Sequence, residues 1–189
     1  MGKALDWGSG AYEALVKCGV RQVSYVPDAG LTNLLNLCKK NKEMTSTLLS
    51  SEEEGIGVAA GAWLGGEKSA VLMQSSGVGN CMNALSLIHS CRFPLLMIIT
   101  MRGEWREFNP WQLPMGQNAA GYLQRSGCIV HRLSDVNDSA EIVAGSAALA
   151  FDTMSAVAVL ISQKVIGVKH FTKENTLFSP KRARSFQRR

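Results

Sequence analysis

Residues 50–62 read Ser-Ser-Glu-Glu-Glu-Gly-Ile-Gly-Val-Ala-Ala-Gly-Ala, residues 69–73 read Ser-Ala-Val-Leu-Met, and residues 74–80 read Gln-Ser-Ser-Gly-Val-Gly-Asn. The pattern predicts a helix that starts with acids and continues with small residues, then a buried strand, then a glycine loop. Each glycine costs a helix about 1 kcal/mol relative to alanine. Such a helix is favoured where another helix, a subunit or a ligand must approach the backbone closely.

Strands and helices are expected to alternate along the whole chain. Helices are expected at 9–18, 31–40, 53–65, 80–91, 117–125 and 137–151, and strands at 22–26, 45–49, 69–74, 94–101, 128–132 and 156–162. Continuous apolar strands between helices are typical of a parallel sheet covered on both faces. With right-handed crossovers, the prediction is a three-layer, doubly wound α/β sheet of about six parallel strands.

The basic charge of the chain is concentrated at its end. The formal net charge is +5, yet residues 169–189 alone carry +6, so residues 1–168 are nearly neutral. We expect one domain over residues 1–168 and a disordered basic tail over 169–189, with nucleic-acid binding unlikely. Five cysteines without a CxxC pair, no signal peptide and no apolar run of membrane-spanning length favour a soluble cytoplasmic protein with reduced thiols.

Several polar residues follow directly after expected strands. They are Asp28, Glu52, the 74–80 loop and Arg102. Ligands of doubly wound sheets lie beyond the carboxyl ends of the strands. These residues are therefore expected to converge on one rim and to form a site.

The acidic helix start has two interpretations. Ser51 with Glu54 and Ser50 with Glu53 both match a capping box, and acids favour a helix N-terminus. Capping needs only one acid, however. The other interpretation assigns one of the carboxylates to a ligand.

The whole pattern resembles the pyrimidine-binding domain of thiamine-diphosphate-dependent 2-oxoacid decarboxylases. Within that family it is most similar to the alpha subunit of sulfopyruvate decarboxylase and the matching half of phosphonopyruvate decarboxylase. The resemblance implies a glutamate that binds N1′ of the cofactor pyrimidine, with a glycine nine positions later. Glu52 and Gly61 fit this spacing, whereas the partner of Glu53 would be Ala62. Glu52 is therefore the expected catalytic and cofactor-binding acid, with Glu53 in reserve.

The glycine loop after the 69–74 strand matches neither GxGxxG nor a Walker A sequence. A simple tight turn is one interpretation of it. The resemblance instead places the loop beside the pyrimidine ring, with Gln74, Ser76, Gly77 and Asn80 as cofactor contacts.

Two further segments resemble family motifs. Val26-Pro27-Asp28 is similar to a VPD motif, which implies that Asp28 faces the substrate and takes part in catalysis; a simple Pro-Asp turn is the alternative. The RGE segment that starts at Arg102 and the PMG segment before Gln117 imply substrate contacts from these two residues. Arg106 could also bind an anionic substrate. A solvated loop or a subunit contact is the other interpretation.

The GDG motif that holds the diphosphate and Mg²⁺ in this family is absent. The resemblance therefore implies a beta subunit that carries them, an alpha subunit that is inactive alone and holds no metal, and self-association through pyrimidine-binding domains. The expected reaction converts sulfopyruvate to sulfoacetaldehyde and CO₂. Phosphonopyruvate, another 2-oxoacid or a non-catalytic scaffold are the alternatives.

Overall fold

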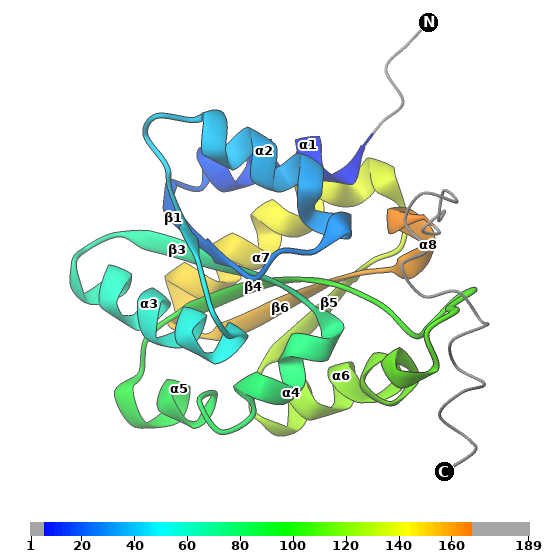
Figure 1. The fold of residues 1–189 in the computed structure, drawn as a ribbon. Coiled ribbons are helices and arrows are strands. Elements are labelled where there is room, and N and C mark those ends of the chain that lie inside the picture. The colour runs from blue at the N-terminus through cyan, green and yellow to red at the C-terminus, as the bar shows by residue number, and fades with distance from the viewer. Residues whose placement is uncertain (1–5, 168–189) are drawn as a thin grey trace, which may run out of the picture.

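Six parallel strands in the order β2-β1-β3-β4-β6-β5 form the middle layer of the structure, a computed structural model that describes residues 6–167 (Figure 1). The strands are β1 (Val20–Tyr25), β2 (Thr45–Leu48), β3 (Lys68–Gln74), β4 (Leu95–Thr100), β5 (Ile129–Leu133) and β6 (Ala156–Ile161). All neighbouring strands pair in parallel. The expected three-layer α/β fold is therefore confirmed.

Helices cover both faces of this sheet. They are α1 (Trp7–Lys17), α2 (Thr32–Lys40), α3 (Glu52–Leu64), α4 (Val78–Cys81), α5 (Ser86–Cys91), α6 (Leu113–Arg125), α7 (Ser139–Thr153) and α8 (Gln163–Ile166), with 3-10 turns η1 (Ala29–Leu31), η2 (Ser75–Gly77), η3 (Pro110–Gln112) and η4 (Val136–Asp138). In Figure 1, α1, α2 and α7 lie above the sheet, and α3 to α6 lie below it. The short helix α8 lies just past the end of β6.

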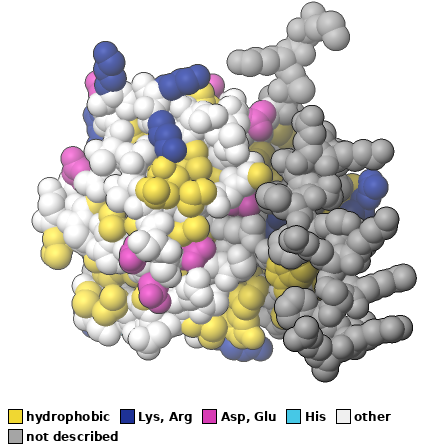
Figure 2. Space-filling model, viewed as in Figure 1, with side chains coloured by type: hydrophobic (Ala, Val, Ile, Leu, Met, Phe, Trp, Pro, Cys, Tyr) yellow, Lys and Arg dark blue, Asp and Glu magenta, His cyan; other side chains and the backbone are white. Residues whose placement is uncertain are grey.

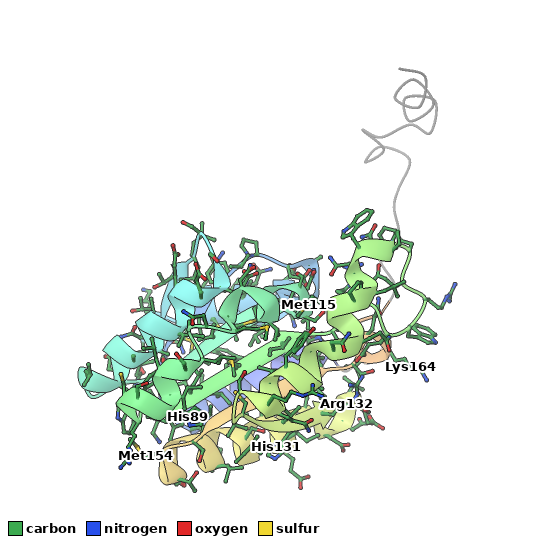
Figure 3. The ribbon with its side chains drawn as sticks, turned by 90° about the horizontal axis from the view of Figure 1, so that it is seen from below. His89, Met115, His131, Arg132, Met154 and Lys164 are labelled. Carbon is green, nitrogen blue, oxygen red and sulfur yellow. The ribbon has the colours of Figure 1, made fainter. Side chains whose placement is uncertain are left out.

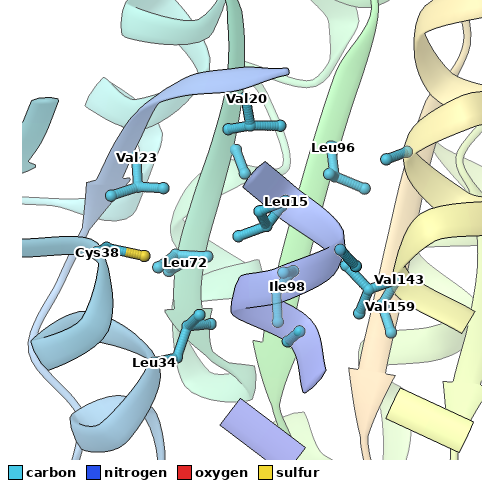
Figure 4. Packing of buried hydrophobic residues seen from close by; sticks show 14 of the residues in the cluster. Leu15, Val20, Val23, Leu34, Cys38, Leu72, Leu96, Ile98, Val143 and Val159 are labelled. Carbon is cyan, nitrogen blue, oxygen red and sulfur yellow. The ribbon is translucent and has the colours of Figure 1, made fainter. Parts of the chain in front are cut away.

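Each face of the sheet has its own core. On the upper face Leu15 of α1 packs over Leu72, Leu96 and Ile98 of the central strands (Figure 4). The lower core joins residues of α3, α4 and α6, such as Ile56, to the opposite side of the same strands. The strands β4 and β6 are buried along their whole length because they have helices on both faces. This burial explains why they are continuous apolar runs in the sequence.

The connections leave β1 and β3 in opposite directions. The chain goes from β1 to the edge strand β2, whereas from β3 it goes to β4 on the other side. Neighbouring strands of this kind form a topological switch point, and loops beyond their carboxyl ends leave room for a ligand. The residues after β1 and β3 therefore occupy the place where a doubly wound fold is expected to bind one.

Some expected boundaries are wrong. The predicted helix at 80–91 is interrupted: α4 ends at Cys81 and α5 begins at Ser86, with mainly i→i+3 hydrogen bonds between them. Helix α1 begins at Trp7, two residues before the expected start at residue 9. Helix α6 begins at Leu113, earlier than expected, because Pro114 occupies a first-turn position where proline is tolerated.

The surface of the described residues is mixed. On the face in Figure 2, acidic and basic side chains are interspersed, and the described residues there form no continuous basic stripe. Leu48, Leu64 and Trp111 are the most exposed large hydrophobic side chains, with Leu64 87% exposed. Within residues 6–167 no helix is both long and apolar enough to cross a membrane. The basic tail expected at 169–189 lies outside the described residues.

Candidate active site

The expected site residues lie at the carboxyl end of the sheet. Figure 3 shows the two ends of the molecule: Met154 precedes β6 at one end, and Lys164 follows β6 at the other. Asp28 follows β1, Glu52 follows β2, Gln74 ends β3 and Arg102 follows β4. Three linked groups of side chains form there.

The first group is centred on Glu52, the first residue of α3. Its side chain is turned inward and only 8% of the residue is exposed, whereas Glu53 and Glu54 are exposed. Asn80 Nδ2 donates a hydrogen bond of 2.8 Å to Glu52 Oε2. The backbone of Gly77 lies against the carboxyl group so closely that a Cβ on Gly77 would be 2.4 Å from Glu52 Cγ and Cδ. Glu52 is thus fixed between an amide donor and a bare backbone.

The acids at the start of α3 have different roles: Glu54 caps the helix, and Glu52 is turned inward. Ser51 is the N-cap residue, but its side chain makes no capping hydrogen bond. Glu54 Oε2 instead accepts a hydrogen bond of 2.9 Å from the N–H of Ser50. Since Glu54 satisfies a backbone donor at this terminus, the capping interpretation does not account for the buried position of Glu52.

The glycines of α3 lie in different environments. A Cβ on Gly55 would be 2.7 Å from Val71 Cγ1, so Gly55 lets the helix pack closely on the sheet. Gly57 and Gly61 are exposed, and a Cβ on either would meet nothing within 4 Å. The contacts within the described chain therefore explain Gly55 but not the other two.

The second group holds Asp28. Its Oδ1 accepts a hydrogen bond of 2.7 Å from Gln74 Nε2, and its Oδ2 accepts bonds of 2.9 Å from Thr100 Oγ1 and from the N–H of Gly30. Ser76 Oγ in turn donates to Gln74 Oε1 at 2.8 Å. These bonds tie the ends of β1, β3 and β4 together, and the segment from Gln74 to Gly77 joins this group to Glu52.

The third group surrounds Arg102, which is 5% exposed. Its Nε and Nη2 donate to the two oxygens of Glu107 at 2.8 and 2.7 Å, in a bidentate pair. The backbone N–H of Arg102 also donates to Ser75 Oγ at 3.1 Å, which links this group to the glycine loop. Arg102 is therefore held in place by the protein itself.

Glu107 is the centre of the loop after β4. Its carboxylate accepts six hydrogen bonds, from Arg102, from the N–H groups of Gly103, Phe108 and Asn109, and from Gln163 Nε2. Burial alone would raise the pKa of this carboxyl. The hydrogen bonds outweigh burial and lower the pKa of Glu107 to about 2.

Gln163 and Gln117 complete the support of this loop. Gln163 is 4% exposed, and its Oε1 accepts hydrogen bonds from the N–H groups of Glu104 and Trp105 at 3.0 and 2.9 Å. Gln117 Nε2 donates to the carbonyl of Gly103 at 2.6 Å. The roles predicted for Arg102 and Gln117 as substrate contacts stay predictions, since both side chains bind the loop in this structure.

Sequence reasoning missed three residues of the site. Thr100 and Gln163 lie at or just after the ends of β4 and β6, so the rule that selected Asp28 also applied to them. Glu107 lies in the middle of a polar loop, where no local pattern distinguishes it. Its role depends on contacts with residues far away in the sequence.

No metal site is apparent in the described part of the chain. Within residues 6–167, no three His, Cys, Asp or Glu side chains are grouped to hold a metal ion. His89 contacts the carbonyl of Ser126 and His131 contacts Ser146 Oγ. His170 lies outside the described residues.

The family model "Thiamine pyrophosphate enzyme, N-terminal TPP binding domain" matches residues 7–120. The chain belongs to this family. The match includes the Glu52 and Asp28 groups and most of the loop around Glu107. The expected resemblance to the pyrimidine-binding domain of thiamine enzymes is therefore confirmed.

The curated relatives that the chain matches are named as decarboxylases. The chain is 46% identical over 107 residues to "Sulfopyruvate decarboxylase subunit alpha" of Methanococcus maripaludis, an alignment that covers 56% of this chain and 64% of that protein. It is 30% identical over 158 residues to the protein of the same name from Methanothermobacter thermautotrophicus, covering 83% and 96%. It is 41% identical over 90 residues to "Phosphonopyruvate decarboxylase" of Streptomyces viridochromogenes, covering 47% and 23%. The chain thus spans less than two thirds of the first of these relatives.

A solved structure shares the fold. The 2-oxoglutarate:ferredoxin oxidoreductase from Magnetococcus marinus superposes with a TM-score of 0.71 at 19% identity, covering 85% of this chain and 29% of that one. At this identity the likeness supports the α/β fold alone.

Proposed function

We propose that this chain is the pyrimidine-binding alpha subunit of a thiamine-diphosphate-dependent decarboxylase that converts sulfopyruvate to sulfoacetaldehyde and CO₂. The observation that carries the proposal is the inward-facing carboxylate of Glu52, held by Asn80 against Gly77. Family membership and the names of the relatives support the activity.

The residues around Glu52 fit the pyrimidine of thiamine diphosphate. Glu52 Oε2 accepts the hydrogen bond from Asn80, while Oε1 accepts no hydrogen bond from the described residues. That oxygen is the atom we assign to hold the proton shared with the ring nitrogen N1′. Gln74, Ser76 and Gly77 would line the ring from the adjoining turn. When bound, thiamine diphosphate supplies the electron sink that loss of CO₂ from a 2-oxoacid requires.

The structure also supports a modified role for Asn80. Its amide contacts Glu52 directly, so we assign it to hold the carboxylate in position, in addition to lining the cofactor site. Asp28 is proposed to face the substrate, because its carboxylate is held by three hydrogen bonds at the switch point between β1 and β3. Arg102 and Gln117 are proposed to contribute to substrate binding by holding the loop after β4 in position.

A beta subunit is proposed to supply the diphosphate site and Mg²⁺. Part of α3 supports a subunit contact there: Gly57 and Gly61 leave open space beside the backbone, and Leu64 is 87% exposed. Self-association through the same kind of domain and a cytoplasmic location remain predictions, as does the domain boundary at 168.

Phosphonopyruvate is the second candidate substrate. A relative is named "Phosphonopyruvate decarboxylase", and a phosphonate and a sulfonate both carry three oxygens on a tetrahedral centre. A non-catalytic scaffold has less support, because Glu52 is turned inward and the side chains around it and around Asp28 keep their hydrogen bonds.

The test is to assay the chain with and without a beta subunit, in the presence of thiamine diphosphate and Mg²⁺. We expect no turnover by the isolated chain and decarboxylation by the assembled pair, fastest with sulfopyruvate in a panel of 2-oxoacids. Robust turnover by the isolated chain would contradict the two-subunit proposal. An assembled pair that turns over none of the 2-oxoacids would contradict the enzymatic one.

A further inference from the structure

A small cavity of about 100 Å³ lies beyond the ends of β1, β4 and β6. Asp28 and Gly30 line it from the segment after β1, Arg102 and Arg106 from the loop after β4, and Gln163 and Ile166 from α8. Because Asp28 belongs both to this cavity and to the hydrogen-bonded group at the switch point, the cavity adjoins the candidate active site.

Two arginines and one carboxylate line this cavity, and each has different interaction partners. The charge of Arg102 is matched by its bidentate pair with Glu107. The carboxylate of Asp28 accepts hydrogen bonds from Gln74 and Thr100. Arg106 forms no ion pair with a carboxylate of the described residues, and its guanidinium carbon lies 5.5 Å from the centre of the Trp105 ring. Arg106 therefore brings a positive charge to the cavity that no described carboxylate neutralises.

The backbone presents Arg106 in an unusual conformation. Its φ angle is 49°, in the left-handed region that residues other than glycine rarely adopt. The residues on both sides are fixed, since the N–H of Trp105 binds Gln163 and the N–H of Phe108 binds Glu107. Strained backbone of this kind persists where the surroundings determine it, and it is concentrated at functional sites. A fixed backbone also lowers the conformational entropy lost when the side chain binds a ligand.

We propose that Arg106 recognises the second anionic group of the substrate, a tetrahedral sulfonate or phosphonate. The inference rests on the proposed decarboxylase function and assigns one residue of this chain to substrate discrimination. A guanidinium donates two parallel hydrogen bonds to an oxyanion. A substrate with two anionic groups needs a cation for the second group, and Arg106 lines the cavity that adjoins the candidate active site. A 2-oxoacid without a second anion, such as pyruvate, gains nothing from this contact.

The test measures discrimination in the assembled enzyme. The quantity is the ratio of kcat/KM for sulfopyruvate, and separately for phosphonopyruvate, to kcat/KM for pyruvate. Hydrogen bonds to charged groups contribute enough that Arg106→Gln is expected to lower the ratio about 10-fold to 100-fold, chiefly through KM. Arg106→Lys keeps the charge but loses the fork of donors, so its ratio should lie in between. Inhibition by 3-sulfopropionate, which has the two anions but no keto group, should weaken in parallel.

Arg92 provides a matched control. It is an exposed arginine with a φ of 50°, but it precedes β4 at the amino end of the sheet. Arg92→Gln carries the same backbone strain and the same charge change, and it should leave the ratio unchanged. A ratio that falls for only one of the two dianions identifies that anion as the one recognised.

Two results would overturn the inference. One is an unchanged ratio in Arg106→Gln. The other is an equal loss of kcat/KM on pyruvate and on the dianions, since Arg106 would then act on a group that all the substrates share. Both differ from failure of the proposed function, in which the wild-type pair would decarboxylate no 2-oxoacid.

Discussion

The substitution Gly77→Ala tests whether the position of Glu52 matters. The backbone of Gly77 has φ −69° and ψ −19°, which alanine adopts without strain, so the change acts through the added methyl group alone. That Cβ would lie 2.4 Å from Glu52 Cγ and Cδ, where ordinary contacts begin at 3.4 Å. The carboxyl group must therefore retreat by about 1 Å, which disturbs the hydrogen bond from Asn80.

This displacement sets the expected magnitudes. A misplacement of about 1 Å in a catalytic group can cost about 10²-fold in rate. Overpacking of a buried site costs about 1–3 kcal/mol of folding free energy. For a domain of this size that corresponds to a fall in Tm of about 2–4 °C per kcal/mol.

The assay measures kcat of the assembled pair and Tm of the isolated chain. Gly79→Ala is the matched control, because a Cβ there would meet only the flexible end of Met115 at 3.5 Å. The control should keep near-normal activity. If Gly77→Ala lowers Tm as expected yet keeps wild-type kcat, the position of the Glu52 carboxylate does not limit catalysis, and the reasoning fails.

Four further predictions follow from single groups. Glu52→Gln should lower kcat of the assembled pair about 10²–10⁴-fold while Glu53→Gln stays active, and the reverse result would assign the role to Glu53. Because the pKa of Glu107 is lowered to about 2, its contribution to stability is complete above about pH 4.5 and is lost as the pH falls towards 2. In urea unfolding, the unfolding free energy of Glu107→Gln should therefore fall less steeply between pH 4.5 and 2 than that of the wild type, and an equal fall would refute this. Gly61→Ala should stabilise the isolated chain by about 1 kcal/mol in thermal unfolding but weaken binding to the beta subunit, and unaltered binding would remove the contact proposed for α3. A thiol reagent at pH 8 should modify exposed Cys91 first, because burial raises the pKa of three other thiols to about 11–12; equal rates for all would show that the core opens readily.

The sequence was sufficient for features that depend on local pattern. The strands β3, β4 and β6 were predictable because burial on both faces requires apolar residues throughout. The positions of Asp28 and Glu52 were predictable as well, since all carboxyl ends of parallel strands lie on one edge. The inward turn of Glu52 was not predictable without the family resemblance, because Glu52, Glu53 and Glu54 are chemically equivalent in the sequence.

Features that depend on distant contacts could not be predicted. The pair formed by Arg102 and Glu107 looks like two ordinary charges in a polar loop until Gln163, 56 residues beyond Glu107, is placed beside them. The interruption between α4 and α5 was missed for another reason. Its i→i+3 hydrogen bonds differ little from helical ones, so the apolar spacing continues through it.

The dependence of the loop after β4 on Gln163 also bears on the order of folding. The N–H groups of Glu104 and Trp105 belong to a loop, but their acceptor is a side chain that arrives only when the last strand, β6, has joined the sheet. The loop that presents Arg106 therefore cannot reach its final form while the chain is incomplete. In hydrogen exchange these two amides should open together with β6 as one cooperative unit, not with the surface loops around them.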